Sequence, residues 1–203
     1  DIQGKIVFKL RSIRLQLLGL YSNLVMFFVL RLKKIKHGRN VRFWSTPYFS
    51  RYPSSTIKVG SNCSFRSDSN SNLIGVSRKC IISTHSAQAF LSIGDHCGFS
   101  GTTIGCKEKL TIGNNVICGA NSLITDFDWH GIDPSRRRNY NGDARPVIIG
   151  NNVFIGYGAV ILKGVSIGDN SVIGANSVVT KDIPANVIAG GNPCGVIKEL
   201  RTV

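Results

Sequence analysis

Hydrophobic residues recur every six positions between residues 149 and 184. Each unit opens with Ile or Val, and Gly follows in four of the six units. A period of six fits neither the 3.6-residue turn of an α-helix nor the two-residue alternation of a strand. It is typical of β-helices, in which each unit forms one side of a coil and the coils stack. We expect the first residue of each unit to point inward, and Gly or Asn near its end to allow a sharp turn.

Weaker copies of the unit extend the pattern toward the N-terminus. They begin near Ile57, lose register between Leu73 and Leu91, and return at Ile93. The pattern stops again between residues 126 and 146 and resumes at Ile149. A regular solenoid that ejects a loop of this length usually does so for function. The sequence therefore predicts a β-helical domain over residues 57–190 that contains a functional loop at 126–146.

The remaining residues divide into three segments. Residues 37–56 hold aromatic and turn-forming residues and are expected to cap or connect. Residues 191–203 form a C-terminal tail. Residues 1–36 have the three-to-four-residue apolar spacing of a helix, with a mostly apolar run of 16 residues from Leu15 to Leu30.

Three interpretations of the N-terminal helix remain open. It can lie at a membrane interface through its apolar and basic residues. It can pack on the β-helix or on a neighbouring subunit. It can also cross a bilayer, although its apolar run is shorter than the ~20 residues that a span needs.

Charge and composition point to an anionic partner. The chain has 203 residues, 42% hydrophobic and 18% charged, with a net charge of +14. Candidate partners are nucleic acid, a phosphorylated cofactor, an acidic glycan or an anionic membrane. No nucleic-acid motif accompanies the charge, so nucleic acid is not expected. Basic residues crowd the first 42 positions: Lys5, Lys9, Arg11, Arg14, Arg31, Lys33, Lys34, Lys36, Arg39 and Arg42.

Six cysteines occur without a Cys-x-x-Cys pair, which argues against a zinc ribbon or a thioredoxin-type motif. Cys63 and Cys97 occupy small fifth positions of their units, and Cys118 an inward first position. Free cysteine behaves as a small hydrophobe. We therefore expect buried, reduced thiols and a cytoplasmic location.

His130 is the candidate catalytic base. It lies in the loop of residues 126–146, whereas the other three histidines, His37, His85 and His96, lie outside it. An imidazole titrates near neutral pH, so it can accept a proton from an attacking hydroxyl. The plain alternative is an exposed loop histidine without a chemical role.

The groups that would assist His130 are less defined by sequence. Asp126 and Asp128 are both close enough along the chain to orient the imidazole or the acceptor. His85 lies in the irregular stretch and is the alternative base.

Residues 93–200 resemble the galactoside and maltose acetyltransferase branch of the hexapeptide-repeat acyltransferases. That branch includes O-acetyltransferases of polysaccharide and O-antigen assembly. The resemblance lies in the hexapeptide that begins at Ile149 and in the histidine 19 positions before it. It implies an all-β fold: a left-handed parallel β-helix with three hexapeptides per coil, preceded here by the helical segment.

The same resemblance implies a mechanism. His130 would be the general base that activates a hydroxyl for direct attack on the thioester of acetyl-CoA, and Asp128 is the expected assisting carboxylate. Gly131 follows the histidine where the simple-sugar enzymes commonly have Pro, and Asp128-Trp129-His130 is more similar to the polysaccharide branch.

The resemblance also implies that acetyl-CoA, the acetyl donor, binds between the subunits of a homotrimer. The matching positions are Tyr157, Ala175, Thr180, Lys181 and Lys198, with Tyr157 standing where the family has a small residue. Backbone amides would meet the pantetheine, and lysines the phosphates. No metal is required.

The sequence thus predicts an O-acetyltransferase of a sugar hydroxyl in polysaccharide, O-antigen or capsule biosynthesis. The acceptor is expected to be a sugar or glycan, anionic or lipid-linked, at the inner face of the cell membrane. Alternatives are N-acetylation of a nucleotide-linked amino sugar, a non-catalytic β-helix scaffold, and a zinc carbonic anhydrase built on three of the four histidines. Four arginines in or beside the loop could meet an anionic acceptor: Arg136, Arg137, Arg138 and Arg145.

Overall fold

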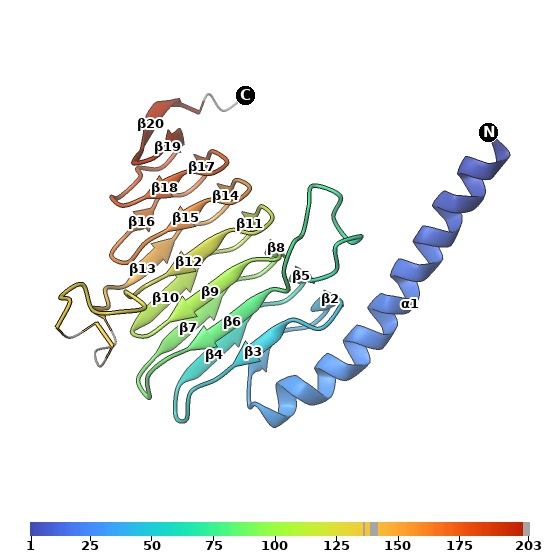
Figure 1. The fold of residues 1–203 in the computed structure, drawn as a ribbon, viewed down its shortest axis with the longest axis horizontal. Helices are drawn as coiled ribbons and strands as arrows, with labels where there is room; N and C mark the ends of the chain where they lie inside the picture. The colour runs from blue at the N-terminus through green and yellow to red at the C-terminus, as the bar shows by residue number, and fades with distance from the viewer. Residues whose placement is uncertain (136, 139–141, 201–203) are drawn as a thin grey trace.

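The chain folds into stacked coils preceded by one long helix. The computed structural model describes residues 1–203 except 136, 139–141 and 201–203. Within that part of the chain, the helix α1 (Ile2–Leu32) leads into three β-sheets that the chain visits in turn (Figure 1). Each coil contributes one strand to each sheet, as the period of six predicts.

The three sheets are built from strands of two to six residues. Sheet A contains β1 (Lys36–His37), β4 (Thr56–Val59), β7 (Phe90–Ile93), β10 (Lys109–Ile112), β13 (Val147–Ile149) and β16 (Ser166–Ile167). Sheet B contains β2 (Arg42–Trp44), β5 (Ser64–Arg66), β8 (Gly98–Ser100), β11 (Ile117–Cys118), β14 (Phe154–Ile155), β17 (Val172–Ile173), β19 (Val187–Gly191) and β20 (Cys194–Glu199). Sheet C contains β3 (Tyr48–Ser50), β6 (Ile81–Thr84), β9 (Thr103–Cys106), β12 (Leu123–Thr125), β15 (Val160–Ile161) and β18 (Val178–Val179).

The strands pair in parallel and in register, so equivalent side chains stack into columns inside the coils. In sheet B the rings of Phe43, Phe65 and Phe99 stack, with centroids 5.5 and 5.1 Å apart. The column continues through Cys118 and Ile155, which are also buried. The inward-pointing first residue that the hexapeptides predict is therefore confirmed.

The corner between sheets A and B is turned by residues with positive φ. Asn115, Asn152 and Asn170 have φ of 57°, 57° and 60°, in the left-handed region that asparagine tolerates. Their side chains also join the coils: the Asn115 amide donates to Asn152 Oδ1 (3.1 Å), and the Asn152 amide to Asn170 Oδ1 (2.9 Å). His96 takes the same corner position one coil earlier, with φ 59°, and its Nε2 lies 3.4 Å from the Asn62 amide. His96 is thus a turn residue.

The C-terminal half of α1 covers the open end of the first coil. Met26 and Leu30 are buried there in the same hydrophobic cluster as Phe43, and the Asn23 side chain accepts a hydrogen bond from the Phe43 amide (3.0 Å). We expected residues 37–56 to be this cap. They instead form β1, β2 and β3, the first complete coil, and α1 does the capping.

The C-terminal segment is also more regular than the tail we expected. β19 and β20 form an antiparallel hairpin at the edge of sheet B, joined through residues 192 and 193. The six cysteines are free and buried, which confirms the interpretation of structural thiols.

The adjacent isoleucines of β13 provide a matched test of the core. Ile149 points inward and is 2% exposed, whereas Ile148 points outward and is 48% exposed. We expect Ile149→Ala to lower the free energy of unfolding by about 2–5 kcal/mol because it leaves a cavity in the column. Ile148→Ala should change it by only ~0.5 kcal/mol. Urea titration followed by circular dichroism measures both, and equal losses would contradict the inward column.

Candidate active site

The loop of residues 126–146 leaves the coils at the corner between sheets C and A, after β12 and before β13. Its two ends run side by side. Phe127 and Ala144 form an antiparallel bridge, the Asp128 amide donates to the Asp143 carbonyl (3.0 Å), and the Arg145 amide donates to the Asp126 carbonyl (2.7 Å). This short ladder holds the loop away from the coils, where it projects as a separate lobe (Figure 1).

Asp126 anchors the loop to the preceding coil. Its buried carboxylate accepts hydrogen bonds from the backbone amides of Lys107 (2.6 Å) and Glu108 (2.8 Å), which turn the same corner. The Cys106 thiol donates to it as well (3.4 Å), and both burial and this carboxylate raise the pKa of Cys106. Both carboxylate oxygens of Asp126 therefore accept hydrogen bonds from backbone amides or the thiol, and neither contacts His130.

Asp128 is joined to the following coil. Its carboxylate forms an ion pair with Lys163, which lies in the turn between β15 and β16 at the same corner. The Lys163 and Asp128 side chains are 20% and 29% exposed, so the pair is partly shielded from water. We expected Asp128 to assist His130. In the structure its carboxylate is paired with the Lys163 ammonium group.

His130 lies on the loop beyond this ion pair and is exposed. Within the described residues its imidazole has no hydrogen-bond partner. The two arms of the loop pack closely on each other at this level, because a Cβ on Gly142 would lie 2.3 Å from the Asp128 Cβ and 2.8 Å from the His130 carbonyl. The loop thus presents an imidazole to solvent from a backbone that is held on both sides.

His85, the alternative base, lies at the foot of the loop in an aromatic cluster. Its ring centroid is 4.9 Å from that of Phe127 and 5.0 Å from that of Trp129, and its Nε2 is 2.9 Å from the Ser83 hydroxyl. Burial lowers its pKa, which the Asp126 charge partly offsets. A ring packed on both sides in this way supports the loop rather than meeting an acceptor. Sequence reasoning did not find the cluster, because His85 lies more than 40 residues before Phe127 and Trp129 in the chain.

The positions expected to bind the donor lie on two different corners. Tyr157 and Ala175 occupy equivalent turns between sheets B and C, one coil apart, and the Asn176 amide donates to the Tyr157 carbonyl (2.7 Å). Thr180 and Lys181 are exposed and turn the corner between sheets C and A, where the His130 loop emerges. A single chain therefore does not bring these two pairs together.

Lys198 stands apart from both pairs. It is exposed on β20, opposite Ile188 in the hairpin at the end of sheet B. Of the loop arginines, Arg136 lies outside the described residues. Arg137, Arg138 and Arg145 are exposed, and the Arg137 guanidinium donates to the Ile132 carbonyl (3.1 Å).

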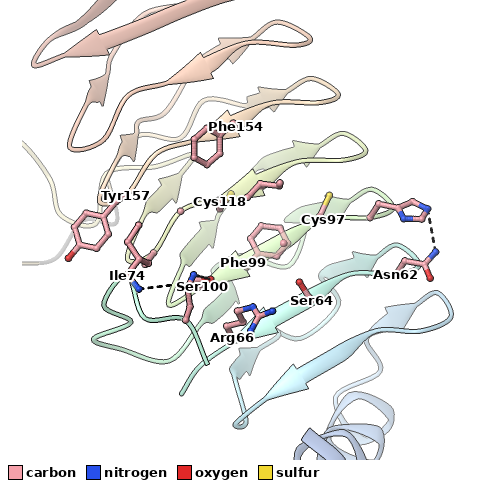
Figure 2. Close-up of a pocket in the computed structure, with 16 residues that line it drawn as sticks. Asn62, Ser64, Arg66, Ile74, Cys97, Phe99, Ser100, Cys118, Phe154 and Tyr157 are labelled. Carbon is pink, nitrogen blue, oxygen red and sulfur yellow. Dashed lines mark hydrogen bonds between the residues drawn. The ribbon is translucent and has the colours of Figure 1, made fainter. Parts of the chain in front are cut away.

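A groove of about 400 Å³ runs over the outer face of sheet B toward Tyr157 (Figure 2). Ile117 and Phe154 are among its apolar lining residues, and Arg66 and His96 are among its polar ones. Tyr157 closes the groove at the corner between sheets B and C, where its hydroxyl accepts from the Asn121 amide (3.3 Å).

A second ejected loop, residues 67–80, borders this groove. It leaves the corner between sheets B and C, and Ile74 lines the groove from it. The Asn121 side chain holds the loop by donating to the Gly75 carbonyl (2.7 Å). The hexapeptide register is lost after Leu73, and this loss was the sequence signal for the second loop. It did not indicate at which corner the loop leaves the coils.

The described residues were also searched for a metal-binding site. Among the described residues, no group of three or more His, Cys, Asp or Glu side chains is placed to hold a metal ion.

Comparison with known proteins shows which family the chain resembles. The family model for the hexapeptide repeat of succinyl-transferase matches residues 146–181. Galactoside O-acetyltransferase of Escherichia coli K12 is 50% identical over 98 residues, which are 48% of each chain. The chain is therefore similar to acetyltransferases built from hexapeptide repeats. It spans about half the length of the curated relatives it matches.

Solved structures of acyltransferases have similar folds. A galactoside acetyltransferase in complex with coenzyme A is 33% identical, covers 82% of this chain and 65% of its own, and gives a TM-score of 0.51. An N-acyltransferase from Bacillus cereus, in complex with dTDP-4-amino-4,6-dideoxyglucose and coenzyme A, gives a TM-score of 0.61. It is 21% identical over 85% of this chain and 88% of that one, so it shows the fold alone.

Replacing the buried carboxylate tests the anchoring of the loop. In Asp126→Asn one amide hydrogen bond loses its acceptor, so we expect unfolding to become easier by about 1–3 kcal/mol. The freed loop should also be cut faster by trypsin at Arg137. Asp133→Asn, an exposed loop carboxylate that bonds to Ser135, is the control and should leave both quantities near wild type. Equal effects in the two variants would contradict the anchoring role.

The lowered pKa of His85 predicts an acid-side loss of stability. As the pH falls below its ordinary value of 6.5, the unfolded chain binds a proton that the folded chain still excludes. Stability is therefore full above pH 6.5 and declines as the pH drops through the folded-state pKa. We expect His85→Gln to flatten this decline in unfolding free energy measured by urea titration at several pH values. His37→Gln, a substitution at an exposed site, should leave the acid-side decline in unfolding free energy unchanged.

Proposed function

We propose that this protein is an acetyl-CoA-dependent O-acetyltransferase that acts on a sugar hydroxyl in polysaccharide, O-antigen or capsule biosynthesis. The observation that carries the proposal is the loop of residues 126–146. It presents an exposed His130 imidazole from a backbone anchored on both sides, at a corner shared with Lys163 and Lys181. Relatives named galactoside O-acetyltransferase support the reaction type.

The chemistry needs only one base. His130 accepts the proton of the acceptor hydroxyl as its oxygen attacks the thioester carbonyl carbon. Backbone N–H donors would stabilise the negative charge that develops on the carbonyl oxygen. The carbon–sulfur bond then breaks, and the imidazolium returns its proton to the departing thiolate. No cysteine nucleophile is required, in keeping with the burial of all six thiols.

Donor binding is proposed at the positions that the resemblance supplies. Tyr157 and Ala175 would offer backbone groups of their corner to the pantetheine amides. Lys181 and Lys198, both exposed, would meet the phosphates, and Thr180 would line the donor site between subunits. The galactoside acetyltransferase described above was solved in complex with coenzyme A, which supports this choice of donor.

Assembly follows from the separation of the two corners. One chain carries His130 at the corner between sheets C and A, and Tyr157 at the corner between sheets B and C. A cyclic trimer uses two different patches of each subunit at every contact, so it can bring the one corner of a subunit against the other corner of its neighbour. We therefore propose a homotrimer of left-handed β-helices with sites between subunits.

The acceptor is proposed to be anionic. Arg137, Arg138 and Arg145 are exposed on the loop that carries His130, and guanidinium groups bind phosphate or carboxylate groups in bidentate fashion. A glycan carried on a pyrophosphate in the cytoplasm has this chemistry.

Acceptor-dependent loss of the acetyl-CoA thioester tests the proposal. With a panel of glycans and nucleotide sugars, we expect His130→Ala to lower kcat/KM by at least ~10²-fold, because it removes the general base. Coenzyme A binding by calorimetry should stay near wild type. His37→Ala is the matched control, an exposed histidine distant from the loop in sequence, and should keep activity.

Other outcomes discriminate the alternatives. Turnover that survives His130→Ala would overturn the base assignment. Activity confined to amino sugars on nucleotide carriers would identify an N-acetyltransferase. Absence of coenzyme A binding by the wild-type protein would favour a non-catalytic scaffold.

A further inference from the structure

Helix α1 presents its more apolar side away from the rest of the protein. The buried side consists of Gly19, Ser22, Met26 and Leu30. The opposite side carries large apolar residues three or four positions apart, which places them along one stripe of the helix. These residues, called the outer stripe below, are between 42% and 70% exposed: Ile6, Leu10, Ile13, Leu17, Leu20, Leu24 and Phe28.

An ordinary surface helix buries its apolar face and exposes its polar one. Helix α1 buries Met26 and Leu30 but leaves the whole outer stripe exposed. The packed side uses small and polar residues for close contact. Gly19 lies against Trp44, the Ser22 hydroxyl donates within the helix to the Leu18 carbonyl (2.6 Å), and Asn23 accepts from the Phe43 amide. Docking on the coils therefore does not account for the outer stripe, which is suited to a second apolar environment.

The charges around the outer stripe indicate which environment that is. Residues 2–36 contain no Asp or Glu. Two copies of this helix would bring like charges together without a compensating carboxylate. Anionic lipid headgroups would instead attract the same cations. The basic side chains of the segment are Lys5, Lys9, Arg11, Arg14, Arg31, Lys33, Lys34 and Lys36.

The contacts of α1 decide how it would meet a bilayer. By length and composition alone, the helix could cross one. However, the Arg11 guanidinium donates to the Asn70 carbonyl (2.8 Å), and Arg14 lies 3.9 Å from the Asp68 carboxylate. With Asn23 bound to Phe43, these contacts tie the middle of the helix to the coils and to loop 67–80. A crossing helix would have to break them or draw polar loops into the hydrocarbon.

We propose that α1 lies in the headgroup region of an anionic membrane, parallel to its surface, with the outer stripe inserted toward the acyl chains. The lysines of the segment and Arg31 contact lipid phosphates, while Arg11 and Arg14 keep their contacts to loop 67–80 and the Gly19 side stays docked on β2. Helices with an apolar stripe and basic flanks bind membranes in this way. The helix thereby holds the protein at a membrane surface without crossing the bilayer.

Co-sedimentation of the full chain with vesicles tests the proposal. We expect binding to phosphatidylcholine vesicles that contain phosphatidylglycerol, weak binding to phosphatidylcholine alone, and a fall in binding as salt rises. Leu17→Glu/Leu20→Glu alters the outer stripe and should lower the partition coefficient at least ~10-fold. Gln3→Glu/Gln16→Glu makes the same charge change at exposed polar positions and is the matched control.

Light scattering and circular dichroism complete the test. Both double variants should keep the helical signal, the melting temperature and the molar mass of the wild type in the absence of lipid. Equal losses of binding in the two variants, or equal binding to neutral and anionic vesicles, would overturn the proposal. So would a change of molar mass in Leu17→Glu/Leu20→Glu without lipid, since the outer stripe would then be an interface between copies of this chain.

Discussion

The in-register stacking of successive coils constrains every other feature of this protein. Apart from β20, each strand pairs in parallel with the equivalent strand of a neighbouring coil, so an extra residue inside a strand would turn side chains from the core to the solvent. Insertions can therefore leave the stack only at corners. Both ejected loops do so, loop 67–80 between sheets B and C and the loop of residues 126–146 between sheets C and A.

The same constraint gives the candidate site its rigidity. A loop that leaves a corner crosses the turns of the coils before and after it, and those turns carry backbone and side-chain donors. Asp126 uses the earlier turn through the amides of Lys107 and Glu108, and Asp128 uses the later turn through Lys163. The two carboxylates that precede the candidate base, Asp126 and Asp128, thus anchor the loop, and the His130 imidazole is exposed.

Helix α1 shows how one element can serve two environments. A stack of coils has an open end whose apolar interior must be covered, and Met26 and Leu30 supply that cover. The small and polar residues on the same side allow close approach to β2. The large apolar residues are thereby left on the opposite side, so that capping the stack and binding a second apolar phase use separate faces of one helix.

The sequence by itself determined the repeat architecture. A period of six with branched residues at the first position follows directly from the geometry of a coil side, so the columns through Ile149, Ile155 and Ile161 were predictable. Gly and Asn at the turns were predictable because they tolerate positive φ, and the loop of residues 126–146 was predictable because it interrupts a strict period.

Only the tertiary structure decided which groups meet. The pairing of Asp128 with Lys163, the packing of His85 on Trp129 and the placing of Tyr157 and Lys181 on different corners depend on which coil and corner each residue occupies. Loops of irregular length shift that count, so position along the chain does not predict it. The cap depends on tertiary structure for a related reason: Phe43 and Phe49 of residues 37–56 lie inside the coils, and the apolar period of α1 reports its helical form but not which side faces the coils.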